Sequence, residues 1–227
     1  EVYLQFDSLR EGPLKALRGA DLREVRRQAL DRLDALGLST TLVVTVMKGV
    51  NDDELGAVVD FALTRPSVRG VTFQPVQRAG RADGFDPAVH RLTLTEVRRR
   101  ILEQTEVFRP EDILPVPCHP DAIAMAYALK TPAGVKPLTG LIDPALLVDG
   151  ARNTIVYEKD DAVRAALFKL ISTGNSPLGG AERLKDLLCC LPRVAAPPGL
   201  GYKDLFRVII MQFMDVEAFD VRSVKKS

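Results

Sequence analysis

The chain has 227 residues, a hydrophobic fraction of 46% and a formal net charge of +1. This length suits one large or two small domains with a sizeable core, and the near-neutral charge gives no general electrostatic attraction to nucleic acid. Three cysteines are too few for a disulfide framework, and no apolar run is long enough to span a membrane. We therefore expect a cytoplasmic protein with no nucleic-acid partner and no transmembrane segment.

The chain begins with a predicted strand and a predicted helix. Residues 2–6 alternate between apolar and polar side chains, and the polar set continues through Gln5 to Asp7. Residues 22–36 repeat apolar side chains at helical spacing, and Gly37 favours the end of that helix. The expected inward stripe of the helix consists of Val25, Ala29, Leu30, Leu33 and Leu36.

A strand, a turn and a helix follow in residues 38–63. Residues 40–48 are dominated by Val, Leu and Thr, which favour a buried strand. After the turn at Gly49, either Asn51 or Asp52 is suited to cap the next helix. Residues 70–77 predict a third strand. The alternation of strands and helices suits parallel pairing and predicts an α/β fold.

The middle of the chain contains a long loop and another helix. Residues 78–91 are rich in Gly, Ala and Asp and follow a strand end, where α/β folds place ligand contacts. Thr93 and Glu96 fit a capping box that starts a helix. Residues 113–116 suit a further short strand.

The pattern changes in the second half, and we divide the chain into a unit at 1–116 and an auxiliary region at 117–227. Residues 202–214 are apolar nearly all round and should be deeply buried. The other expected elements of this region are a hairpin around residues 131–134 and helices at 160–172 and 181–191.

Several segments resemble a known family. FDSL, LRG, LxxLGLSTTLVVTVMKGVNDDE and GVTFQPVQ occur in one order, and they resemble the later strands of radical S-adenosylmethionine enzymes of the molybdenum-cofactor cyclase branch. PVPCHPD, NTIVYEKD, DLLCCLP, FRVIIMQFMD and FDVRSVKKS are similar to a narrower group, which includes tetraether lipid synthase and a pterin methylase. The resemblance implies a partial parallel (β/α) barrel, TIM-like and truncated at its N-terminus, followed by a mixed, mainly helical region.

The resemblance also implies a chemistry. In that family a [4Fe-4S] cluster on a CxxxCxxC loop binds S-adenosylmethionine, and reduction gives a 5′-deoxyadenosyl radical that abstracts hydrogen from an unactivated carbon. The outcome is methylation or C–C bond formation on a small molecule or lipid, with a reductant of the flavodoxin or ferredoxin type. This chain has no CxxxCxxC. Both ends look cut, so we expect a piece of a longer protein that is inactive alone.

The resemblance assigns six residues to the cofactor: Gln5, Asp7, Thr41, Thr45, Gln74 and Gln77. Gln74 and Gln77 lie on opposite faces of a regular strand, and a bulge at Pro75 would change which of them points inward. Asp7 is equally suited to hold the turn after its strand. Arg81 is a candidate for an anionic group of the substrate. Cys118 is a candidate ligand of an auxiliary iron–sulfur cluster.

Two other functions compete with this one. The first alternative is a non-catalytic α/β module whose strand face holds a partner. The second is a barrel enzyme without iron, such as an aldolase, in which Lys48 would be the lysine near a strand end. Lys48 has no obvious acidic partner in the sequence, so we rank this alternative last.

Overall fold

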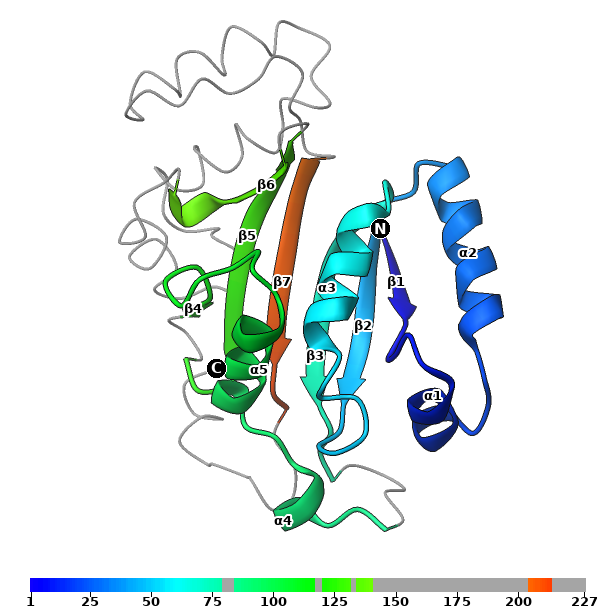
Figure 1. Cartoon of the computed structure of the whole chain (residues 1–227), viewed down its shortest axis with the longest axis vertical. Coiled ribbons are helices and arrows are strands. Elements are labelled where there is room, and N and C mark those ends of the chain that lie inside the picture. The colour runs from blue at the N-terminus through cyan, green and yellow to red at the C-terminus, as the bar shows by residue number, and fades with distance from the viewer. Residues whose placement is uncertain (79–83, 117–119, 132–133, 141–203, 214–227) are drawn as a thin grey trace, which may run out of the picture.

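The computed structural model of the chain describes residues 1–78, 84–116, 120–131, 134–140 and 204–213 (Figure 1). These residues form a mixed α/β fold around a seven-stranded sheet of order β1–β2–β3–β7–β5–β4, with β6 paired to β5. The strands are β1 (Val2–Gln5), β2 (Thr40–Val46), β3 (Val68–Pro75), β4 (Leu114–Pro115), β5 (Ile123–Thr131), β6 (Gly134–Pro137) and β7 (Leu205–Met211). The helices are α1 (Glu11–Arg18), α2 (Arg23–Ala35), α3 (Leu55–Thr64), α4 (Pro87–His90), α5 (Leu94–Gln104) and the 3-10 turn η1 (Leu138–Gly140).

The sheet has a parallel part and an antiparallel part. Strands β1, β2, β3 and β7 run in one direction, and β5 runs antiparallel to β7, β4 and β6. The α/β prediction is therefore confirmed as a mixed fold with a mostly parallel sheet. The partial barrel stays a prediction.

Helices α3 and α5 cover one face of this sheet (Figure 1). Leu42, Val44 and Val46 of β2 are fully buried, and they belong to the same core cluster as Val58 of α3 and Phe73 of β3. Because strand side chains alternate, the intervening residues lie on the opposite face. We call this opposite face the polar face, and its members on the first three strands include Gln5, Thr41, Thr45, Thr72 and Gln74.

Strand β7 lies between β3 and β5, although more than a hundred residues separate it from β3 in the chain. Phe206, Val208 and Ile210 are fully buried, whereas the alternate residues are only partly buried. The prediction that this segment is deeply buried is thus confirmed for every second residue of β7. One sheet contains strands from 1–116 and from 117–227, and the division into two units stays a prediction.

Some local predictions are confirmed. Thr93 and Glu96 form the expected capping box at the start of α5. Strands β5 and β6 form the expected hairpin, and β4 lies within residues 113–116. The helices expected at 160–172 and 181–191 lie outside the described residues.

Two local predictions are wrong. Asn51 and Asp52 do not cap α3, because their side chains accept hydrogen bonds from the backbone N–H groups of Met47 and Gly49. Glu54 occupies the capping position and makes no side-chain capping hydrogen bond. Val25 of α2 is 64% exposed and Leu36, the residue after α2, is 71% exposed, so neither belongs to an inward stripe. The helix lies beside the edge strand β1 (Figure 1), and a helix at an edge buries a narrower face than one lying on a sheet.

Candidate functional site

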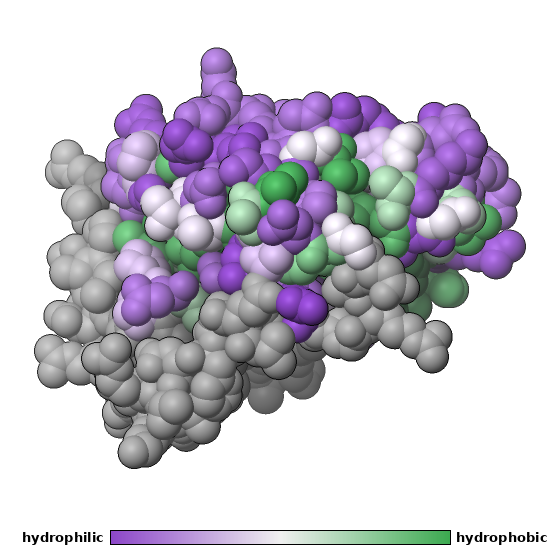
Figure 2. Space-filling view, turned by 90° about the horizontal axis from the view of Figure 1, so that it is seen from below, coloured by the Kyte–Doolittle hydropathy of each residue, from purple (hydrophilic) through white to green (hydrophobic). Residues whose placement is uncertain are grey.

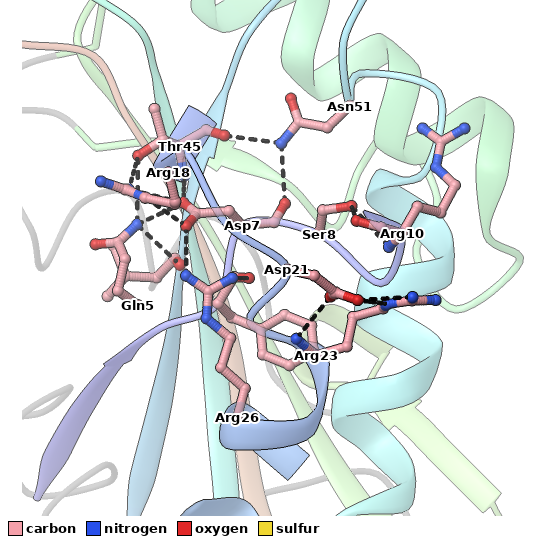
Figure 3. Close-up of polar contacts among 12 residues, drawn as sticks. Gln5, Asp7, Ser8, Arg10, Arg18, Asp21, Arg23, Arg26, Thr45 and Asn51 are labelled. Atoms are coloured by element: carbon pink, nitrogen blue, oxygen red, sulfur yellow. Dashed lines mark hydrogen bonds and ion pairs between the residues drawn. The ribbon is translucent and has the colours of Figure 1, made fainter. Parts of the chain in front are cut away.

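The site begins at Asp7, which follows the carboxyl end of β1. Asp7 is fully buried and has a φ of 59°, the only positive φ of a non-glycine residue among the described residues. Aspartate tolerates this left-handed conformation better than most residues. The conformation directs the carboxylate back toward the ends of β1 and β2 (Figure 3).

Both carboxylate oxygens of Asp7 are saturated with hydrogen bonds. Oδ1 accepts from Nε2 of Gln5 at 2.6 Å, from Nη2 of Arg18 at 3.0 Å and from the backbone N–H of Thr45 at 3.0 Å. Oδ2 accepts from Nε of Arg18 at 2.8 Å and from Nη2 of Arg26 at 2.9 Å. Burial raises the pKa of this carboxyl, but the hydrogen bonds from Arg18, Thr45 and Gln5 outweigh burial and hold it below its usual value. Asp7 therefore organises the site around it.

Asn51 and Glu54 join the turn after β2 to the turn after β1. Nδ2 of Asn51 donates to the backbone oxygen of Asp7 at 2.9 Å (Figure 3). Glu54, which is 7% exposed, accepts from Oγ of Ser8 at 2.5 Å and from the backbone N–H of Leu9 at 3.2 Å. The segments FDSL and MKGVNDDE, far apart in the sequence, therefore form one polar cluster in space.

The polar face presents a row of side chains next to this cluster. Nε2 of Gln5 donates to Oγ1 of Thr45 at 3.3 Å. Thr45 pairs in register with Gln74 on β3, and the register runs without a shift from Thr41 to the end of β2, so Pro75 makes no bulge. Paired residues of adjacent strands lie on the same face of a sheet. Gln5, Thr45 and Gln74 are thus brought together across three parallel strands.

Sequence reasoning missed Arg18, which completes this row. Its Nη2 donates to Oγ1 of Thr45 at 3.0 Å as well as to Asp7, and its side chain is 34% exposed. Asp7 balances only one of the two guanidinium groups that it binds, so the cluster of Asp7, Arg18 and Arg26 carries a net positive charge. The segment LRG in the resemblance was the signal that could have identified this arginine.

The remaining predicted residues lie apart from the row. Thr41 lies on the polar face nearer the amino end of β2, where Oγ1 donates to Glu1 at 2.8 Å. Gln77 lies two residues beyond β3, and within the described chain its buried side-chain amide has no hydrogen-bond partner. Arg81 and Cys118 lie outside the described residues. Where the structure describes the chain, no cluster of His, Cys, Asp and Glu side chains is arranged to bind a metal ion.

Figure 2 views the molecule from the end at which the parallel strands finish. The described surface there is largely hydrophilic, with hydrophobic residues visible between the polar ones. At this end of the sheet, the polar side chains of the site therefore have both hydrophilic and hydrophobic residues around them.

Comparison with known proteins gives one informative match. The chain is 35% identical over 119 residues to 7,8-dihydro-6-hydroxymethylpterin dimethyltransferase of Methanocaldococcus jannaschii. The match covers 51% of this chain and 24% of that relative, so the chain spans about a quarter of the relative's length. No protein-family model matches the chain. The expected similarity to a pterin-methylating enzyme is thus observed over about half of the chain, and the assignment to a branch of the family stays a prediction.

None of the described helices is long and apolar enough to cross a membrane.

The observed geometry can bind a polar ligand. The amides of Gln5 and Gln74, the hydroxyl of Thr45 and the guanidinium of Arg18 lie together at the carboxyl ends of parallel strands. Ligands of α/β proteins typically bind at this end of the strands.

Proposed function

We propose that the chain is part of a radical S-adenosylmethionine enzyme that abstracts hydrogen from an unactivated carbon, in a methylation or C–C bond-forming reaction. The observation that carries the proposal is the joining of FDSL and MKGVNDDE beside the row of Gln5, Thr45 and Gln74. These segments carry the family resemblance, and their contact beside a row of hydrogen-bonding side chains supports a ligand site at this end of the sheet.

The residues of the polar face suit S-adenosylmethionine. Gln5, Thr45 and Gln74 offer donors and acceptors for a ribose and an adenine. Arg18, held by Asp7, offers positive charge for a carboxylate, and the amide of Gln77, which has no hydrogen-bond partner among the described residues, offers a further polar contact. When bound and reduced, S-adenosylmethionine supplies the radical; the residues of this chain orient the ligand and exclude water from it.

The iron–sulfur cluster does not fit the residues present. The three cysteines stand at positions 118, 189 and 190, and this spacing does not match CxxxCxxC. The proposal therefore places the cluster ligands in another part of a longer protein, and this chain would be inactive alone. Cys118 is proposed as a ligand of an auxiliary cluster, and Arg81 as a contact of the substrate.

The relative supports the reaction class. Its name describes a dimethyltransferase acting on a pterin, which favours methyl transfer and a small-molecule substrate over a lipid chain. A flavodoxin or ferredoxin would supply the electron, and the protein would act in the cytoplasm.

The test uses the longer protein, purified without oxygen and reconstituted with iron and sulfide. On reduction with dithionite it should convert S-adenosylmethionine to 5′-deoxyadenosine, measured by chromatography. Gln5→Ala and Thr45→Val should each weaken cofactor binding by about 1 kcal/mol, roughly fivefold in Kd. Gln28→Ala and Thr64→Val, both remote from the polar face, are the matched controls. A reconstituted wild type that releases no 5′-deoxyadenosine would overturn the proposal in favour of a non-catalytic module.

A further inference from the structure

Arg207 of β7 crosses the amino-terminal part of the polar face. The register places Tyr3, Thr41, Gly70 and Arg207 in one row across β1, β2, β3 and β7. A Cβ atom at Gly70 would lie 2.6 Å from Cγ of Arg207, so only glycine leaves room for the arginine stem at this position. The side chain therefore passes directly over β3 toward the far strands.

The guanidinium of Arg207 ends on the first residues of the chain. Nη2 pairs with Oε1 of Glu1 at 2.6 Å and donates to the hydroxyl oxygens of Tyr3 and Thr41, each at 3.3 Å. Thr41 donates to the same oxygen of Glu1 at 2.8 Å. These contacts link β7, in the middle of the sheet, to β1 and β2.

In the described part of the chain, β1 has a neighbouring strand on one side only. Among the described strands it pairs only with β2, and Tyr3 is 62% exposed. At the carboxyl end the chain is held by Asp7, which binds Arg26, and by Asn51. At the amino end of β1, the contacts of Arg207 hold the chain in the same way. Gln5 lies between these two sets of contacts.

We propose that Arg207 is a positioning residue: it holds β1 in register with β2 and so keeps Gln5 beside Thr45. The anchoring of β1 is independent of the proposed function. The consequence for ligand binding rests on that function, because it assumes that Gln5 and Thr45 contact the ligand.

Hydrogen exchange of the 227-residue chain, followed by mass spectrometry, tests the anchor. Arg207→Met and Glu1→Gln should each accelerate exchange at residues 2–6 by roughly tenfold relative to β2 and β3. The double variant should exchange no faster than Arg207→Met, because both changes remove the same contact. Arg98→Met is the control: Arg98 contacts the backbone oxygen of Ile113 at 3.1 Å, far from β1, and its loss should leave the exchange ratio unchanged. Equal acceleration of β1, β2 and β3 in Arg207→Met, or none, would overturn the anchor.

Affinity for S-adenosylmethionine in the reconstituted longer protein tests the consequence. Arg207→Met should raise the Kd severalfold. The double variant of Arg207→Met and Gln5→Ala should bind about as weakly as Gln5→Ala, because the loss of Arg207 acts through the position of the Gln5 side chain. If the wild type binds S-adenosylmethionine and the Arg207→Met variant binds it equally well, the positioning role alone is overturned. A wild type that does not bind S-adenosylmethionine overturns the proposed function, and the exchange experiment still decides the anchor.

Discussion

The side-chain amide of Asn51 donates to the backbone carbonyl oxygen of Asp7 over 2.9 Å and so ties the turn after β2 to the end of β1. The same nitrogen donates to the backbone oxygen of Thr45 at 2.8 Å, and Oδ1 accepts from the N–H of Met47 at 2.9 Å. Both ends of this amide are used inside the cluster, which explains why Asn51 does not cap α3.

Replacing Asn51 by Ala should destabilise the fold by about 2–3 kcal/mol, because it leaves buried backbone groups without partners. Urea unfolding followed by circular dichroism at 222 nm measures the loss. Asn51→Asp should be similarly harmful, because it presents an oxygen to the carbonyls of Asp7 and Thr45. Asp53→Ala removes an exposed ion pair with Arg10 and should cost less than about 1 kcal/mol. An Asn51→Ala variant as stable as Asp53→Ala would contradict the joining role.

The charge of Asp7 is a separate prediction. Asp7→Asn keeps the size of the side chain and tolerates the positive φ, but it leaves Arg18 and Arg26 without their counterion. We expect a loss of about 3–5 kcal/mol, the usual consequence of removing one partner of a buried ion pair. Asp21→Asn, at an exposed pair with Arg23, is the control and should leave the stability close to that of the wild type. A cost for Asp7→Asn as small as the control's would show that the carboxylate charge is unimportant.

Acid should weaken the protein through the same group. The pKa of Asp7 is lower in the folded chain than its usual value of 3.8, so the unfolded state takes up a proton first as the pH falls. The stability that the Asp7 carboxylate contributes is therefore complete above its unfolded pKa and is lost as the pH falls through its folded pKa. Urea midpoints between pH 6 and pH 2.5 should show the difference between wild type and Asp7→Asn shrinking toward the acid end. A constant difference would refute the assignment.

Local chemistry made several elements predictable from the sequence. The capping box of Thr93 and Glu96 and the hairpin formed by β5 and β6 depend on neighbouring residues, so short segments specify them. The choice between Gln74 and Gln77 stayed open in the sequence, because a bulge at Pro75 would reverse it; the register of β3 pairs Gln74 with Thr45.

Long-range relationships were not predictable in the same way. The run LFRVIIM has the composition of either a buried helix or a central strand, and only its pairing with β3 and β5 decides between them. The exposure of Val25 follows from the place of α2 at the sheet edge, which no helical pattern encodes. Arg18 entered the site through its contacts with Asp7 and Thr45, which lie on other elements.

Lys130 of β5 gives a prediction at alkaline pH. Nζ donates to the backbone oxygens of Ala62, Arg65 and Val68 at 3.3, 3.1 and 2.8 Å, and it lies 5.2 Å from the ring centroid of Phe206. Burial is the main effect on this amine and lowers its pKa from 10.5 to about 8.

Between those two values the unfolded chain holds the proton that the folded chain has released, so the stability should rise with pH. Lys130→Met should abolish this rise and lower the overall stability, because the carbonyl oxygens between the end of α3 and the start of β3 lose their donor. Lys136→Met, at an exposed position on β6, should keep the rise. Urea midpoints from pH 7 to pH 10.5 measure both variants, and a Lys130→Met variant with the wild-type slope would exclude this amine as the cause.

Gly70 gives the sharpest test of packing on the polar face. An added Cβ would lie 2.6 Å from both Cγ and the backbone oxygen of Arg207, and the backbone oxygen cannot move without disturbing the pairing of β3 with β7. Gly70→Ala should therefore destabilise the chain by about 1–3 kcal/mol.

The matched control for this substitution is Gly12→Ala, since Gly12 lies in α1 with no heavy atom within 4 Å of an added Cβ. That variant should be stabilised by about 0.5–1 kcal/mol, because alanine restricts the unfolded chain and favours a helix. If both variants were stabilised, β3 and β7 would not approach each other as closely as the structure shows. If Gly70→Ala alone is destabilised and also exchanges faster at residues 2–6, the close passage of Arg207 over β3 is what secures β1.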